Sequence, residues 1–331
     1  LLLTSVTLGI SYPWAKVRRL RSFSGTTLVG EHPLDFHGDP KKMLRGYLLV
    51  GAMFVLYGLT SQFSPVAGMV AFLAIAALWP ALFKAGMQFR MANTSWRGLR
   101  FRFKGTVGGA YAALLPLFVP ALLIVAVALQ APPEGTKPPG WFIACVLAVP
   151  LVVVLIVPWL LWRLKKYQHD HYALAQWQTE LRTGPGSFYV VFLKTIGVSL
   201  LAMVVFAGVV FVGAMVFGTA AFLTGSADGE AGVGTVIAIV AGVIVAVLGM
   251  LLVQMLPRPY ATSRIQNLLC TRTGNRSLRF RSELKFLPLL GLTLKNWLLM
   301  VVTLGLYWPF APVALARVRL QAVHLETRSG P

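Results

Sequence analysis

A chain of 331 residues that is 57 % hydrophobic and only 12 % charged cannot build a water-compatible surface, because soluble domains carry about 25 % charged residues. Its mean hydropathy of +0.73 indicates a membrane protein. The net charge of +20 has no long hydrophilic face to accompany it, which argues against nucleic acid as a partner. We expect part of that charge to contact anionic lipid headgroups.

Six stretches have the length and apolar composition of a membrane-crossing helix, which needs about 20 residues. Short connectors join them into three pairs, so each pair is expected to run out and back. The predicted fold class is an all-α polytopic membrane protein, a single membrane domain over residues 1–331. The six stretches are residues 44–62, 65–83, 106–130, 141–162, 191–224 and 234–256.

Basic residues are distributed unevenly around these stretches. The connectors within pairs contain one basic residue, Lys137, whereas the segments between pairs contain most of the others. Loops rich in Lys and Arg stay on the cytoplasmic side of bacterial membranes. The sequence therefore predicts that the segments between pairs face the cytoplasm.

Short segments ahead of the helix pairs alternate apolar and basic residues. Residues 99–104 read Leu-Arg-Phe-Arg-Phe-Lys after a Gly98 turn, and residues 278–281 repeat the alternation. A period of two is typical of a strand, so short cytoplasmic β-hairpins are expected. Residues 26–38 are a looser copy and residues 177–184 the weakest. The predicted repeat units cover about residues 22–84, 90–163 and 170–256, with a partial unit at 264–325.

A Thr-Leu-Gly motif occurs near each end of the chain, at residues 7–9 and 303–305, and each copy is followed by proline, an aromatic residue and a basic helix. A single crossing by the second copy would place its basic helix outside. We therefore expect these helices to be re-entrant or to lie at the interface. The motif's structural residues are Gly9, Pro13, Trp14, Gly305 and Pro309.

The alternating segments also supply the candidate binding residues. Arginine pairs with phosphate through two hydrogen bonds, so these side chains could hold an anionic headgroup or substrate. The simpler interpretation is that they mark topology and are solvated. The candidates are Arg100, Arg102, Lys104, Arg276, Arg279 and Arg281.

A second candidate site lies at residues 32–39. His32, Asp35 and His37 could offer nitrogen and oxygen ligands to a divalent metal. The favoured alternative is a polar hairpin in which His37 caps or packs beneath Gly38. The sequence His169-Asp170-His171 is interpreted as lying at headgroup level, since adjacent helical residues point apart.

None of the six stretches contains an acidic residue. Proton-coupled pumps generally need ionisable groups inside the membrane, and acid–base catalysis needs positioned carboxylates or histidines. The sequence thus argues against a proton pump and against an enzyme. It predicts no catalytic residue and no cofactor.

The motifs together resemble the YjgN-like family of bacterial inner-membrane proteins. The resemblance rests on residues 7–21, on Phe36-His37-Gly38-Asp39-Pro40, on residues 93–105 and on the closing Thr-Leu-Gly-Leu-Tyr-Trp-Pro-Phe-Ala. The chain departs from the family's pattern at Ser11 and at Pro312. The resemblance implies a bacterial cytoplasmic membrane location, no established activity and a zinc metallopeptidase as a candidate partner.

The leading functional prediction is a transporter-like or channel-like protein that handles a lipid or small amphiphile. It depends on repeated helix pairs with proline-interrupted spans over basic hairpins. The alternative is a scaffold or accessory subunit of a membrane complex. Its partners would be anionic membrane lipids and a protein within the membrane.

Overall fold

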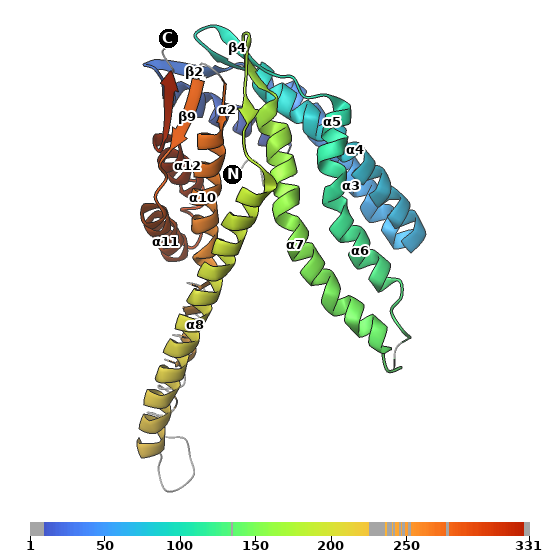
Figure 1. The fold of residues 1–331 in the computed structure, drawn as a ribbon, viewed down its shortest axis with the longest axis vertical. Helices are drawn as coiled ribbons and strands as arrows, with labels where there is room; N and C mark the ends of the chain where they lie inside the picture. The colour runs from blue at the N-terminus through green and yellow to red at the C-terminus, as the bar shows by residue number, and fades with distance from the viewer. Residues whose placement is uncertain are drawn as a thin grey trace. The chain divides into compact units, whose positions relative to one another are not determined.

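The computed structural model describes residues 10–133, 135–224, 253–275 and 278–327, together with residues 236, 240, 242–244, 246 and 249–250. The chain divides into two compact units, Leu1–Leu181 and Arg182–Pro331. Each unit combines long apolar helices with a small antiparallel sheet at one end (Figure 1).

The first unit contains a six-stranded sheet in which the strands follow chain order. Its hairpins turn at positions with positive φ, Gly30 with Glu31 and Arg97 with Gly98, as type I′ turns require. The predicted hairpins are therefore present, but they join into one continuous sheet rather than remaining separate. The strands are β1 (Leu28–Val29), β2 (His32–Phe36), β3 (Thr94–Trp96), β4 (Leu99–Phe103), β5 (Tyr172–Leu174) and β6 (Trp177–Gln178), followed by β7 (Glu180–Leu181).

Strands that are neighbours in this sheet are separated in the chain by helices. The chain leaves β2, forms two packed helices and returns to β3, which pairs with β2. It then leaves β4 and returns to β5, which pairs with β4. The helices are α2 (Tyr12–Thr26), α3 (Pro40–Phe63), α4 (Pro65–Ala92), α5 (Val107–Leu114), α6 (Val119–Ala128) and α7 (Gly140–Asp170), with the 3₁₀ turn η1 (Leu115–Phe118) between α5 and α6.

The second unit follows the same plan. Helices α8 and α10 pack together. In the chain, α11 and α12 connect β9 to β10, and these two strands pair with each other. Its elements are α8 (Pro185–Thr224), α10 (Pro257–Arg272), β8 (Thr273–Gly274), β9 (Leu278–Ser282), α11 (Phe286–Val302), α12 (Ala311–Gln321) and β10 (Val323–Thr327).

Five helical segments of the described chain are long and apolar enough to cross a membrane: Pro40–Phe63, Pro65–Ala92, Val107–Ala128, Gly140–Asp170 and Pro185–Met215. They match five of the six predicted stretches. The sixth, residues 234–256, lies largely outside the described residues. The third segment is interrupted at η1, which contains Pro116, because proline removes a helical hydrogen bond.

One backbone hydrogen bond recurs at the base of each helical excursion. The N–H of the residue after a strand donates to the carbonyl of the residue that ends the excursion. The four bonds measure 2.7–3.0 Å, so the start and end of each excursion are fixed side by side. They run from His37 to Asn93 (2.7 Å), Lys104 to His171 (2.9 Å), Arg182 to Arg272 (2.8 Å) and Glu283 to Ala322 (3.0 Å).

Phenylalanine and glycine two residues apart form the transition from strand to helix in the first unit. Phe103 is only 6 % exposed and packs with Met87 and Tyr167. Its ring lies over Gly105, where an added Cβ would meet Phe103 Cε1 at 2.5 Å and the Tyr167 hydroxyl at 2.6 Å. Phe36 covers Gly38 in the same way, with Cε1 at 2.4 Å from an added Cβ. The Phe-x-Gly motifs noted in the sequence therefore have a steric basis.

Replacing Gly105 by alanine tests this packing. The added methyl group has no space between two buried rings, so we expect the unfolding free energy to fall by about 1–3 kcal/mol. The measurement is thermal unfolding of the purified protein in detergent.

Gly46→Ala is the matched control, since an added Cβ there has nothing within 4 Å and alanine favours helix. It should leave the unfolding temperature unchanged or raise it. Equal stability of both variants would contradict the steric assignment.

Candidate functional site

Strand β4 carries the predicted basic stripe, and its two faces differ as the alternation predicts. Arg100, Arg102 and Lys104 are exposed, whereas Phe103 is buried. In the sheet, Arg102 lies opposite Ala173 and Phe103 opposite Tyr172. On the apolar face Phe103 is buried in a cluster with helix residues, while Leu99 is exposed. The three basic side chains themselves are exposed.

The basic stripe, defined as Arg100, Arg102 and Lys104, has no carboxylate partner among the described residues. Three cations along one short stretch repel one another, so they favour an anion that can bridge them. Phosphate suits this arrangement because guanidinium binds it through paired hydrogen bonds. The stripe can therefore bind a phosphate-bearing group without first breaking an ion pair.

Strand β9 of the second unit has a different charge balance. Arg281 lies 2.8 Å from Glu283 and 3.7 Å from Glu326, and Arg279 is opposite Glu326 in the ladder. Arg281 is therefore partly neutralised by carboxylates, and a carboxylate occupies the position opposite Arg279. Arg276, the sixth basic candidate, lies outside the described residues.

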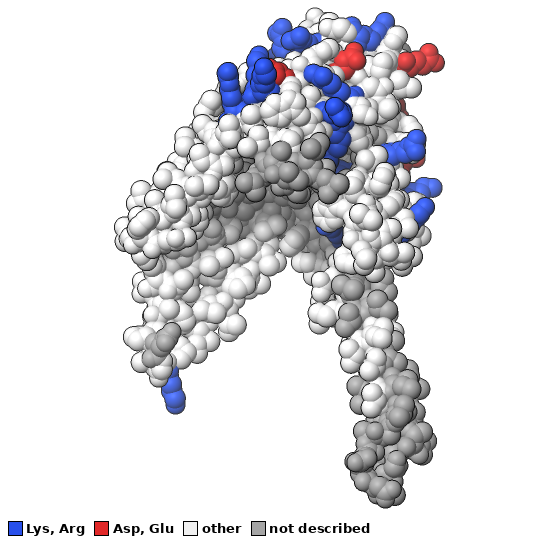
Figure 2. All heavy atoms as spheres, turned by 180° about the vertical axis from the view of Figure 1, so that it is seen from behind, with Lys and Arg blue, Asp and Glu red and all other residues white. Residues whose placement is uncertain are grey.

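Basic side chains gather at the end of the helices that carries the strands (Figure 2). The apolar helical segments below them carry few charges, and Lys137 is the one basic residue of the connector between α6 and α7. Each unit thus combines an apolar helical part with a basic sheet end.

The predicted metal ligands are placed on or next to β2. His32 and Asp35 are exposed on the strand, and His37 Nε2 lies 2.8 Å from the Ser95 hydroxyl of β3. Across the part of the chain that the structure describes, no three His, Cys, Asp or Glu residues are grouped as a metal ion would require. His37 instead connects β2 to β3, and the metal hypothesis remains a prediction.

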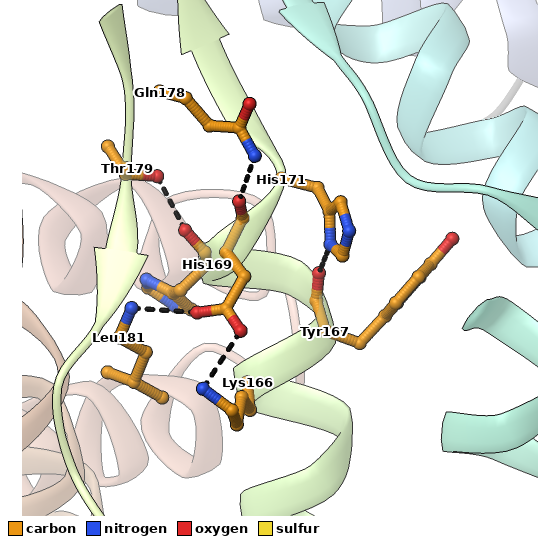
Figure 3. Close-up of polar contacts among 8 residues, drawn as sticks. Lys166, Tyr167, His169, His171, Gln178, Thr179 and Leu181 are labelled. Carbon is orange, nitrogen blue, oxygen red and sulfur yellow. Dashed lines mark hydrogen bonds and ion pairs between the residues drawn. The ribbon is translucent and has the colours of Figure 1, made fainter.

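Asp170 organises a polar junction where α7 meets β5, and Figure 3 labels its partners Lys166, Gln178 and Leu181. Its carboxylate accepts from the Leu181 backbone N–H at 2.8 Å and pairs with Lys166 at 3.0 Å. Its carbonyl accepts from the Gln178 amide at 2.8 Å. One residue at the helix end, through its side chain and its backbone carbonyl, thus bonds to residues of β6 and β7.

Residues around Asp170 extend this junction. His171 Nδ1 donates to the Tyr167 carbonyl at 2.8 Å, which places its proton on Nδ1 because a carbonyl only accepts. The Tyr167 hydroxyl donates to the Thr106 carbonyl at 3.0 Å. Burial raises the pKa of Tyr172 above its usual value, and nearby Arg90 opposes the shift. This phenol is therefore neutral near pH 7.

The sequence reasoning missed the structural role of Asp170. It interpreted His169-Asp170-His171 as a headgroup-level segment, whereas the carboxylate bonds to residues eleven and four positions away. A carboxylate four residues after Lys166 was the available signal, since such pairs share a helix face.

The terminal motif residues are placed as follows. Pro13 is buried in the first turn of α2 and Trp14 is exposed. Gly305, with φ +88°, and Pro309 lie in the turn between α11 and α12. Gly9 lies outside the described residues.

A family of bacterial proteins of unknown function, DUF898, matches this chain over residues 1–330. The chain belongs to this family. The inner membrane protein YjgN of Salmonella typhimurium is 29 % identical over 126 residues. That stretch covers 38 % of this chain and 31 % of YjgN, so the match spans about a third of each. No solved structure matches the chain.

Membership of DUF898 confirms the resemblance drawn from the sequence motifs. It supports an inner-membrane protein and supplies no activity. The structure adds a physical basis for two of those motifs in this DUF898 protein. Gly38 and Gly105 lie under phenylalanine rings, and Asp39 caps α3 by accepting from the Lys41 N–H at 2.9 Å.

Two substitutions of Asp170 test the junction. Asp170→Ala leaves the buried Leu181 N–H without its acceptor, which costs about 1–3 kcal/mol. Asp170→Asn keeps an oxygen acceptor and loses only the partly exposed pair with Lys166, worth at most about 1 kcal/mol. Thermal unfolding should therefore rank wild type above Asn and Asn well above Ala. Identical losses of thermal stability in the two variants would show that the hydrogen bond from the Leu181 N–H does not contribute to stability.

Proposed function

We propose that this DUF898 protein is an inner-membrane protein that handles an anionic lipid or small amphiphile at its basic sheet. Its architecture would be transporter-like or channel-like, without a proton relay inside the membrane. The observation that carries this proposal is the basic stripe on β4, which has no carboxylate partner in the described chain.

The position of the stripe supports a headgroup ligand. Lys104 is followed by Gly105 and Thr106, and Thr106 caps α5 by accepting from the Gly109 N–H at 3.1 Å. The basic residues therefore stand directly above the start of a candidate span, the level at which lipid phosphates lie. Each Lys or Arg near an anionic surface contributes about 1 kcal/mol of attraction.

The proposed topology places every sheet on the cytoplasmic side, with the helices as out-and-back pairs. Two features support it: adjacent paired strands flank the α3–α4 and the α5–α7 excursions, and basic residues concentrate at the sheet end. Together with the four equivalent base hydrogen bonds, these features favour an internal repeat.

Removing charges from the stripe tests headgroup binding. Arg100→Gln with Arg102→Gln should raise the phosphatidylglycerol concentration that half-saturates the thermal shift in detergent by on the order of tenfold or more. The control pair is Arg279→Gln with Arg281→Gln in β9, where Arg281 pairs with Glu283 and Glu326 and Arg279 lies opposite Glu326 in the ladder.

The control pair should change the half-saturating concentration less. Equal changes in both double variants would show that overall charge, rather than the stripe, attracts the lipid. No response of wild type to any anionic lipid would contradict the proposal itself.

Labelling of introduced cysteines tests the orientation. With Cys145 and Cys270 replaced by alanine, Lys137→Cys should react with an impermeant maleimide added to intact cells, because it lies at the far end of α6 and α7. Arg18→Cys, exposed on α2, should react only after permeabilisation. The reverse pattern would invert the topology.

One observation favours the alternative role of a scaffold or accessory subunit. The apolar windows of α3, α7 and α8 bury none of their residues within the described chain. Lipid, another membrane protein or residues of this chain outside the described ranges must cover these surfaces. A stoichiometric second protein in native nanodiscs, combined with no lipid response of the purified chain, would favour the scaffold role.

A further inference from the structure

The α11–α12 segment leaves the sheet of the second unit and returns to the same sheet. Five residue pairs of β9 and β10 are in antiparallel register, from Val323 opposite Ser282 to Thr327 opposite Leu278. Both strands therefore lie on one side of any membrane that the segment meets. An odd number of crossings between them is excluded.

Side-chain bonds fix the base of this excursion to α10. The Arg319 guanidinium Nε donates to the Gln266 side chain at 2.7 Å, and the Gln266 amide donates to the Arg319 carbonyl at 2.8 Å. Gln266 is buried. The return helix is therefore held against the body of the unit and is not a loose tail.

The turn between α11 and α12 is a Schellman motif with apolar side chains around it. The Gly305 N–H donates to the Met300 carbonyl at 2.7 Å and the Leu304 N–H to the Val301 carbonyl at 3.1 Å, the two bonds of that motif. Thr303 donates to the Leu299 carbonyl and accepts from the Tyr307 N–H. The exposed apolar residues here include Leu304 (94 %), Leu306 (80 %), Trp308 (64 %) and Phe310 (62 %).

Charged residues define the ends of the uncharged part of the α11–α12 segment. No charged residue occurs between Lys295 of α11 and Arg317 of α12. Lys295 lies seven residues before the end of α11, and Arg317 six residues after the start of α12. At 1.5 Å per residue both cations lie about 10 Å from the turn. Between these two cations and the turn, both helices are uncharged.

Helix α8 of the same unit provides a reference for the level of these cations. Lys194 lies nine residues after Pro185, as Lys295 lies nine residues after Phe286. Beyond Lys194, α8 continues uncharged to Thr224, about 45 Å of helix, enough for a hydrocarbon core of about 30 Å. Beyond Lys295, α11 continues for only about 10 Å, which is too short to cross.

We propose that α11 and α12 form a wedge that enters the membrane from the sheet side and turns back within the near leaflet, with lipid acyl chains as its partner. The wedge comprises residues 296–316 and reaches about 10 Å below its flanking cations. That depth matches the boundary of headgroups and acyl chains, where helices that do not span insert. Trp297 and Trp308, both exposed, are suited to this zone.

Spin labelling in vesicles of phosphatidylethanolamine and phosphatidylglycerol tests the wedge. With Cys145 and Cys270 replaced by alanine, a nitroxide is attached at Leu306→Cys in the turn. We expect high collision with oxygen and low collision with a water-soluble nickel chelate. Phe310→Cys is the second probe, in case the first variant does not fold.

Two further sites calibrate the readout. Leu201→Cys, exposed on α8 beyond Lys194, should give the oxygen-rich pattern of a crossing helix. Leu320→Cys, beyond Arg317 at the base of the wedge, should be open to the nickel chelate.

Each other outcome at Leu306 would overturn the proposal in a distinct way. High collision with nickel would place the turn in water above the membrane. Low collision with both reagents would place another protein surface, a second copy included, on the turn. These readouts do not depend on headgroup binding by the basic stripe, so the two proposals can fail separately.

Discussion

Backbone pairing between the strands on either side of each helical excursion is the constraint on which this structure depends. Membrane helices satisfy their own backbone groups, so nothing in an isolated apolar helix determines where it must return. The pairing of β2 with β3, of β4 with β5 and of β9 with β10 supplies that information. The base hydrogen bonds, such as Lys104 to His171, complete it. The sheets thus determine where each helical excursion begins and ends, and the helices supply the apolar surface.

The same constraint explains where the charges lie. A strand that closes a helical excursion must remain outside the hydrocarbon, and its outward face then meets water and headgroups. Arginine at alternate positions suits that face, while phenylalanine on the other face packs on helix ends, as Phe103 does against Met87. In β9, Arg281 pairs with carboxylates and Arg279 lies opposite Glu326, whereas the arginines of β4 have no carboxylate partner in the described chain. This difference, rather than the total charge of +20, makes the β4 stripe a candidate binding surface.

Local periodicity in the sequence was sufficient for part of this fold. The alternation in residues 99–104 predicted β4, and apolar length predicted five candidate spans. The continuous sheet was not predictable, because its partners are far apart in the chain, as His37 and Asn93 are. The role of Asp170 was missed because its bond to the Leu181 N–H exists only once β7 returns to the helix end. The predictions for Arg276 as a binding residue and for residues 234–256 as a sixth span concern residues that lie wholly or largely outside the described chain.

The backbone conformation of Leu304 bears on the proposed insertion of the wedge into the membrane. Helix ends of this kind usually have glycine at the left-handed position, but here Leu304 holds it at φ +49° and Gly305 follows. A left-handed backbone costs an L-residue about 1–2 kcal/mol, and a leucine side chain that is 94 % exposed to water gains nothing in return. Transfer of a leucine side chain into an apolar medium contributes about 1.5–3 kcal/mol, which offsets the backbone cost. Arg97 adopts a similar conformation, φ +51°, in a hairpin turn of the sheet, so the backbone alone does not require a membrane at Leu304. If the wedge inserts as proposed, burial of the Leu304 side chain among acyl chains offsets the backbone cost of the turn.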